Sequence, residues 1–223
     1  MEPLARFEDV KIPLAEPVHG LEEVSGVLGV PEWWPTGSRV SVILAHGPTG
    51  NKDEPLLVAL QQALTERKML TLRFNFPFAE AEKRRPDAMP VLERCMRHAI
   101  ATLGRDPTAS PAHLFLGGRG LGSRVAANLA TSSVRCDGLF FLGFPLHPAG
   151  KPEEIRVDRL FRIVSPMLFV QGTRDRQCEI PVLRRTLQRV GAPTLLHVVQ
   201  EADQSFKVPR KTGRTAAEVH REI

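Results

Sequence analysis

A glycine-rich turn near the middle of the chain has the spacing of a site for acyl-transfer chemistry. Residues 118–122 read Gly-Arg-Gly-Leu-Gly, between an apolar segment typical of a buried strand and a segment typical of a helix. A nucleophile elbow has Gly-x-Ser-x-Gly at this place, because the turn is tight and the helix packs close to the strand. Here the central residue is Gly120, which has no hydroxyl. The motif therefore predicts an elbow without its nucleophile.

Two later positions correspond to the other members of a catalytic triad. Asp175 follows the segment 167–170, an expected strand, and suits the acid position, whereas Gln204 occurs where the chain order elbow, acid, histidine requires the histidine. Histidine is the general base in such a triad, and the aspartate only orients it. Removal of the serine or the histidine costs on the order of 10⁶ in turnover in subtilisin. Since glutamine cannot shuttle a proton near neutral pH, we expect only the acid to be retained.

The backbone groups that would stabilise an oxyanion are also expected to be incomplete. One N–H comes from the residue after the nucleophile, here Leu121, and another from the loop at residues 47–49. That loop begins with Gly47 and continues with Pro48, which has no N–H to donate. The N–H groups at the start of the helix from Leu121, with Arg119 nearby in sequence, predict instead a site for a small anion.

Short apolar, β-branched segments alternate with longer amphipathic segments along the chain. Strands are expected at residues 40–45, 70–74, 113–116, 138–142, 167–170 and 195–199, and helices at residues 56–67, 90–103, 121–131 and 180–190. This alternation predicts an α/β fold with a mostly parallel sheet and helices on both faces. The weaker strand candidates at 7–12 and 23–30 predict an N-terminal edge hairpin within residues 1–35. We expect one domain over residues 1–223, with its chemistry at the carboxyl ends of the strands.

Composition and charge narrow the class of protein. The chain has 223 residues, of which 42% are hydrophobic, as expected for one globular domain. Its three cysteines, Cys95, Cys136 and Cys178, argue against a disulfide framework and a zinc cluster. The net charge of +5 is mild, tyrosine is absent and no nucleic-acid-binding module is recognisable, which argues against a nucleic-acid partner. We expect a cytoplasmic protein with no cofactor, no metal and no membrane contact.

Five further side chains near the site loops are candidate functional groups. His46 is expected to anchor its loop, and His147 either lines a pocket or stabilises a turn. Cys178 is the only thiol near a site loop, but no histidine is clearly placed to activate it. Ser123 is expected to be exposed or hydrogen-bonded to the backbone. Neither Ser123 nor Ser205 is a convincing substitute for the missing nucleophile.

Several stretches resemble a small hydrolase-like family. They are residues 72–78 (Leu-Arg-Phe-Asn-Phe-Pro-Phe), 84–87 (Arg-Arg-Pro-Asp), 143–152 (Gly-Phe-Pro-Leu-His-Pro-Ala-Gly-Lys-Pro) and 171–175 (Gln-Gly-Thr-Arg-Asp). That family includes the testis-expressed protein thirty and the third subunit of the NSL histone-acetyltransferase complex, and it is distantly similar to dienelactone hydrolases. The similarity runs from about Val40 to Thr215. It implies an α/β-hydrolase fold, here a minimal one with no cap domain.

The same resemblance locates the departures from a catalytic site. Members that look catalytic carry Gly-(Lys/Arg)-Ser-Met-Gly at the elbow and Asp-His-Ser-Phe near the end. The corresponding residues here are Gly-Arg-Gly-Leu-Gly and Asp-Gln-Ser-Phe at 203–206, so Asp175 carries over whereas Gly120 and Gln204 depart from the pattern. The resemblance thus implies a hydrolase fold without the triad serine and histidine.

Three hypotheses about function follow. The first is a non-catalytic hydrolase-fold protein that binds a small molecule or a protein partner. The second is an esterase or other hydrolase that uses unrecognised groups, and the third is a structural subunit of a complex; the fold alone does not decide among them. The first predicts Gly120 at positive φ, a conformation that glycine adopts at little cost. It also predicts that Asp175 pairs with Arg174 or Arg176, or hydrogen-bonds Gln204, because a solitary buried carboxylate is costly.

Overall fold

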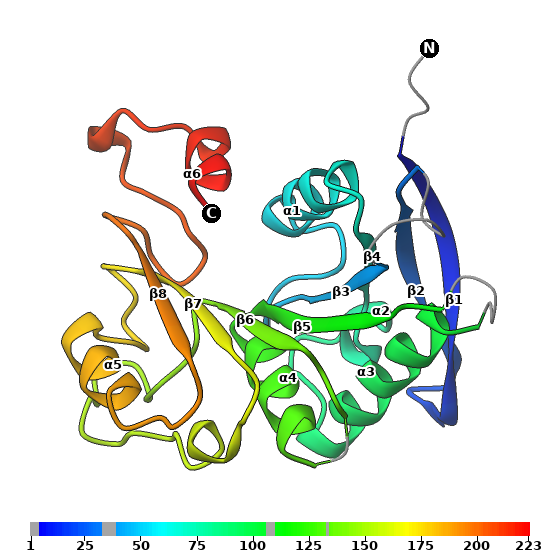
Figure 1. Ribbon diagram of the computed structural model, residues 1–223, viewed down its shortest axis with the longest axis horizontal. Coiled ribbons are helices and arrows are strands. Elements are labelled where there is room, and N and C mark those ends of the chain that lie inside the picture. The colour runs from blue at the N-terminus through cyan, green and yellow to red at the C-terminus, as the bar shows by residue number, and fades with distance from the viewer. Residues whose placement is uncertain (1–4, 33–38, 106–109, 133) are drawn as a thin grey trace.

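The structure, a computed structural model, describes residues 5–32, 39–105, 110–132 and 134–223. Its centre is one eight-stranded sheet with the strand order β1-β2-β4-β3-β5-β6-β7-β8 (Figure 1). The strands are β1 (Arg6–Val18), β2 (Leu21–Val30), β3 (Val40–Ala45), β4 (Leu70–Phe74), β5 (His113–Arg119), β6 (Gly138–Leu142), β7 (Met167–Gly172) and β8 (Thr194–Val199). Strands β3 to β8 are parallel to one another, which confirms the expected mostly parallel sheet.

An antiparallel hairpin forms one edge of this sheet. β1 pairs with β2 from Arg6 opposite Val30 to Pro13 opposite Glu23, and β2 pairs antiparallel with β4. Both strands extend beyond the segments 7–12 and 23–30 that alternation indicated. The hairpin therefore lies on the far side of the sheet from the strands β5 to β8 that carry the elbow and the acid.

Helices cover the sheet in two groups. They are α1 (Pro55–Glu66), α2 (Pro77–Glu80), α3 (Met89–Leu103), α4 (Leu121–Ser132), α5 (Ile180–Leu187) and α6 (Ala216–Glu222). α3, α4 and α5 pack into one apolar core, and α1 and α6 pack into a smaller core on the opposite face (Figure 1). None of the described helices is both long and apolar enough to cross a lipid bilayer.

Two helices were missed by periodicity because they are short. α2 begins with Pro77, a residue favoured at the first position of a helix. α6 follows Thr215, whose hydroxyl accepts a hydrogen bond from the Glu218 N–H while the Glu218 carboxylate bonds back to the Thr215 N–H. This capping box is readable from the sequence Thr-Ala-Ala-Glu. α5 ends at Leu187, three residues before the expected end at residue 190.

The loops that matter for chemistry meet at one edge of the parallel part of the sheet. The carboxyl ends of β3, β5, β6, β7 and β8 all point to this edge, because their strands are parallel. Behind it, the rings of Phe141, Phe144 and Phe169 pack together, with the Phe141 and Phe169 centroids 5.0 Å apart. This aromatic cluster gives the loops after β6 and β7 a rigid base.

Candidate active-site region

The turn between β5 and α4 has the geometry of an elbow. Gly120 is the single residue between the strand and the helix, and its φ is 52°, so the predicted positive φ is confirmed. The flanking glycines have a separate reason. A Cβ atom at Gly118 or Gly122 would lie 2.1 or 2.5 Å from the carbonyl oxygen of Ala45. Only glycine at these two positions lets β5 and α4 pack this closely against β3.

Pro48 faces the tip of the elbow. Among the described residues, apart from its two neighbours in sequence, a Cβ atom at Gly120 would have one neighbour within 4 Å, the Cδ of Pro48 at 3.6 Å. The Cδ of proline is bonded to its nitrogen, where other residues carry the N–H. The loop after β3 therefore presents a proline ring to position 120 where a hydrolase of this fold presents a donor. The first residue of α4 is Leu121, directly after the turn.

Arg119, the last residue of β5, forms a buried ion pair. Its guanidinium pairs with the Glu54 carboxylate at the start of α1, and only 5% of the residue is exposed. Its Nη1 also lies 3.5 Å from the hydroxyl oxygen of Ser205. A Cβ atom at Gly47 would lie 2.5 Å from the Arg119 Cζ, so the guanidinium packs against the Gly47 backbone. Arg119 thus joins the elbow to the loop after β3, and Glu54 already balances its charge.

Asp175 lies in the loop after β7 and is buried. Its Oδ2 accepts a hydrogen bond of 2.5 Å from the Gln171 side-chain amide, and its Oδ1 accepts one of 2.8 Å from the Gln177 N–H. Burial raises the pKa of this carboxyl above its ordinary value, although both hydrogen bonds act in the opposite direction. The Asp175 carboxyl is therefore held by uncharged donors.

The partners predicted for Asp175 were wrong. Arg174 lies on the surface and pairs with Glu201 at 3.7 Å, and the side chain of Gln204 is exposed. The reason is that Gln171, within β7, is buried beside the carboxylate. Its other amide atom, Oε1, accepts the N–H of Phe144 at 3.0 Å, which fixes the orientation of the amide. The sequence offered one signal for this contact, a glutamine four residues before Asp175.

The three triad positions nevertheless converge at the end of β6. The Gly120 N–H donates a hydrogen bond of 2.9 Å to the carbonyl of Leu142. A Cβ atom at the next residue, Gly143, would lie 3.0 Å from the carbonyl oxygen of Gln204 and 3.7 Å from the Asp175 Oδ2. Gly143 itself has a φ of 64°. The fold therefore brings positions 120, 175 and 204 together around residues 142–143.

His46 and His147 are both occupied by the backbone. The His46 Nε2 accepts the Phe76 N–H at 3.0 Å, and its Nδ1 lies 2.8 Å from the Gly47 carbonyl, to which it donates. Burial lowers the pKa of His46 to about 4, and the nearby positive charge of Arg119 acts in the same direction. His46 is therefore neutral and anchors the loop after β3, as expected.

His147 repeats this arrangement in the loop after β6. Its Nε2 accepts the Glu179 N–H at 3.2 Å, and its Nδ1 lies 2.9 Å from the Pro148 carbonyl. The side chain is buried. Of the two roles considered for His147, the structure thus favours the stabilisation of a turn.

The remaining nucleophile candidates differ in their surroundings. Cys178 is buried, and this burial raises the pKa of its thiol far above the ordinary value. The Ser123 hydroxyl donates to the Gly118 carbonyl at 2.6 Å; it is hydrogen-bonded to the backbone as expected, but it is buried and not exposed. Ser205 is only partly buried and borders a cleft beside the elbow.

That cleft has a volume of about 620 Å³. It lies between the loop after β3, the segment that follows β8, and α6. The polar side chains that line it are Thr49, Asn51, Asp53, Glu54, Arg119, Ser205, Lys207, Arg214 and His220. Burial lowers the pKa of His220. We call this space the elbow cleft.

The comparison with known families agrees with this geometry. Residues 38–223 match the family described as the alpha/beta hydrolase domain. The chain belongs to this family. The match covers more than four fifths of the sequence and includes the elbow, the acid and position 204.

Solved structures of the same fold were found in several bacteria and an archaeon. Dienelactone hydrolase from Anabaena variabilis is 18% identical with a TM-score of 0.71, and the alignment covers 93% of this chain and 91% of that one. An alpha-beta serine hydrolase homologue from Coxiella burnetii is 18% identical with a TM-score of 0.69, covering 88% of each chain. The esterase Pf2001 of Pyrococcus furiosus is 15% identical with a TM-score of 0.70, covering 90% and 83%. At these identities the likeness shows the fold alone, and the narrower resemblance stated from the sequence stays a prediction.

Proposed function

We propose that this α/β-hydrolase-family chain does not perform serine-hydrolase chemistry and instead binds a small anionic molecule in the elbow cleft. One observation supports the first part of this proposal, the absence of serine-hydrolase chemistry. Gly120, at the tip of the elbow with a φ of 52°, has no side chain, and an exposed glutamine stands where the base would be. Neither a nucleophile nor a proton shuttle is present at the two positions where the triad mechanism requires them.

Neighbouring groups do not replace the missing ones. Both ring nitrogens of His46 and of His147 are engaged with the backbone, so neither imidazole is free to take a proton from a nucleophile. The thiol of Cys178 is buried and is held protonated by its raised pKa. Pro48, in addition, supplies no N–H towards the elbow.

The charge of the elbow cleft supports an anionic ligand. Arg119 and Arg214 are balanced by Glu54 and Glu222, whereas the amine of Lys207 forms no ion pair within the described residues. The Lys207 side chain lines the cleft together with the Ser205 hydroxyl. A carboxylate or phosphate group would find a positive charge and a hydroxyl donor there.

A second candidate function, hydrolysis through unrecognised groups, has one specific observation in its favour. The Ser205 hydroxyl lies 3.5 Å from a guanidinium nitrogen of Arg119, and His220 lines the same cleft. A hydroxyl, a positive charge and an imidazole around one cleft are the components of nucleophilic catalysis. A structural role in a complex stays a prediction from the sequence.

Turnover and ligand binding separate these functions. We expect hydrolysis of p-nitrophenyl acetate and butyrate no faster than with a Ser205→Ala variant or with a carrier protein. We also expect succinate or inorganic phosphate to raise the melting temperature, and a Lys207→Ala variant to reduce that rise. Ester turnover that disappears in Ser205→Ala would support the second function and reject the first.

A further inference from the structure

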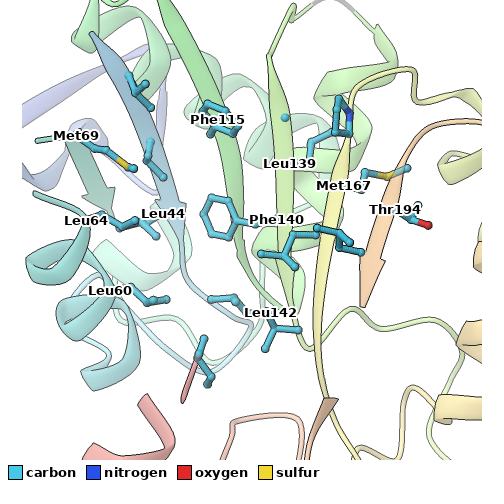
Figure 2. Close-up of a pocket in the computed structure, with 18 of the residues that line it drawn as sticks. Leu44, Leu60, Leu64, Met69, Phe115, Leu139, Phe140, Leu142, Met167 and Thr194 are labelled. Atoms are coloured by element: carbon cyan, nitrogen blue, oxygen red, sulfur yellow. The ribbon is translucent and has the colours of Figure 1, made fainter. Parts of the chain in front are cut away.

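The sheet face that carries α1 and α6 has an open apolar groove of about 480 Å³, which we call the sheet-face groove. Figure 2 shows Leu44, Phe140 and Leu142 projecting from the strands into it, with Leu60 and Leu64 of α1 along one side. The full lining is Val40, Val42, Leu44, Leu60, Leu64, Met69, Phe115, Gly138, Leu139, Phe140, Leu142, Pro166, Met167, Leu168, Val170, Pro193, Thr194, Leu195 and Ile223. Thr194 is the only residue of this lining with a polar side chain.

This groove leaves large apolar side chains in water. Leu195 of β8 is 71% exposed and Leu168 of β7 is 37% exposed. The faces of a parallel sheet are normally both covered, and the opposite face here is covered by α3, α4 and α5. An exposed apolar surface that is hollowed marks a binding site more often than chance. The groove shares no lining residue with the elbow cleft, so it is a separate site.

Two basic residues stand at one rim of the sheet-face groove. Arg39 directly precedes Val40, and Lys68 directly precedes Met69; both of these neighbours line the groove. Ser41 of β3 is paired with Leu70 of the parallel strand β4. Arg39 lies two residues before Ser41, and Lys68 lies two residues before Leu70. The two basic residues are therefore at the same end of neighbouring strands.

The backbone at both rim residues is unusual. Arg39 has a φ of 51° and Lys68 a φ of 67°, in the left-handed region that residues with a side chain rarely adopt. At Lys68 this conformation ends α1, because the Lys68 N–H donates to the Thr65 carbonyl and the Met69 N–H donates to the Leu64 carbonyl, as at many helix C-termini. Neither side chain takes part in an ion pair within the described part of the chain.

From the apolar lining and the basic rim, we propose that the sheet-face groove binds a long-chain fatty carboxylate, with its alkyl chain over β6 and β7 and its carboxylate at Arg39 and Lys68. The lining offers almost no hydrogen-bonding group, so it suits an alkyl chain and not a polar molecule. Its volume falls within the range of small-molecule sites, about 300–1,000 Å³. The positive rim complements the one charge that such a ligand carries.

The size of the exposed surface favours this ligand over a second copy of the chain. A stable protein interface takes about 20–30 residues from each side. Four of the lining residues are exposed, namely Pro166, Leu168, Pro193 and Leu195, and the others are buried or half-buried. These four exposed residues are far fewer than a stable protein interface takes from each side, whereas a volume of about 480 Å³ accommodates a small molecule with one alkyl chain.

Chain length provides the first test. Octanoate, decanoate, dodecanoate and tetradecanoate are titrated calorimetrically, each below its critical micelle concentration. We expect affinity to rise by about fourfold for each added methylene group until the groove is full, and then to level off. Affinity that does not depend on chain length would overturn the proposal.

Two double variants test the lining and the rim separately. Leu168→Gln with Leu195→Gln changes exposed side chains and should weaken both dodecanoate and dodecanol, by about tenfold or more. Arg39→Gly with Lys68→Gly removes both charges, and glycine adopts the positive φ at little cost, so the fold should be kept. This rim variant should weaken dodecanoate by about two- to tenfold and leave dodecanol unchanged.

Three results would reject the fatty-carboxylate site. One is dodecanoate binding that is unchanged in the rim variant, and another is dodecanol binding that is unchanged in the leucine variant. The third is sedimentation that shows a dimer, dissociated by the leucine variant, with no dodecanoate binding; the groove would then belong to a second copy. Thermal unfolding of each variant verifies that it is folded.

Discussion

The buried layer beneath the strand ends differs sharply from the surface above it. In the buried layer, His46 and Asp175 each make two hydrogen bonds and are almost inaccessible to water. At the surface, position 120 has no side chain and the Gln204 side chain is exposed. Both regions belong to one structural unit, since positions 120, 175 and 204 converge on the end of β6.

The difference explains why we expect position 175 to matter more for stability than positions 120 and 204. Asp175 accepts the buried side-chain amide of Gln171 and the part-buried N–H of Gln177, so its replacement leaves a buried donor without a partner and carries a cost in stability that is independent of catalysis. Gly120 has no side chain that could stabilise the fold, and any other residue at this position would have to adopt a positive φ. We therefore expect substitutions in the buried layer to affect folding most, and substitutions at the surface least.

The largest effect is expected from protonation of His46. Its pKa falls from the ordinary 6.5 to about 4 in the folded protein, because the neutral ring is buried. Between these pH values the unfolded chain binds a proton that the folded chain does not, so stability is complete above about pH 6.5 and declines as the pH falls towards 4. The loss amounts to about 3 kcal/mol at most, from 1.36 kcal/mol per pKa unit.

Denaturation in urea at several pH values between 4.5 and 7 measures this effect. A His46→Gln variant, which has no titrating group at the position, should lose this part of the pH dependence. An equally steep decline in wild type and variant would show that other groups cause it and that His46 is not the buried neutral support described above.

The next effect concerns the acid position. Asp175→Ala leaves the Gln171 amide and the Gln177 N–H without an acceptor, and we expect a loss of about 1–3 kcal/mol in the free energy of unfolding. Relief of the buried charge offsets part of this loss, because burial already raises the pKa of the carboxyl. As a control, Arg174→Ala removes an exposed ion pair and should change stability by less than about 1 kcal/mol. Equal effects of the two changes would remove the distinction between buried and surface positions.

The smallest effect is expected at the elbow. Gly120→Ser forces a residue with a Cβ atom to a φ of 52°, at a cost of about 1–3 kcal/mol. We expect the lower end of this range, because the new Cβ atom meets only the Pro48 Cδ at an ordinary 3.6 Å. Gly150→Ser is a matched control with a φ of 76° and no neighbour within 4 Å. A variant at 120 that melts at or above the wild-type temperature would contradict the strain argument.

Much of the fold followed from the sequence because it depends on local patterns. The strands at 40–45, 70–74 and 138–142 have the expected bounds, and the elbow appears between β5 and α4 as the glycine spacing predicted. Apolar alternation and glycine-rich turns are properties of neighbouring residues, so one sequence is enough to read them.

The contacts of the site residues were harder to predict, because they depend on distant parts of the chain. Asp175 is bonded by Gln171 and not by an arginine, and Arg119 is neutralised by Glu54, which lies 65 positions away in the sequence. The charge at residues 174 and 176 suggested a partner by proximity in sequence alone. Strand direction and burial instead place Gln171 beside Asp175. The sheet-face groove and its basic rim depend on the pairing of β3 with β4, which the sequence does not reveal.

The central claim is that the site lacks a nucleophile and a base while its frame is intact. It is tested most directly by intact-protein mass spectrometry after incubation with a fluorophosphonate. We predict no adduct on the wild-type chain and a single adduct on the Gly120→Ser, Gln204→His double variant, with neither single variant labelled to the same extent. A stoichiometric adduct on the wild-type chain would contradict the account, because it would prove an activated nucleophile that the structure does not provide.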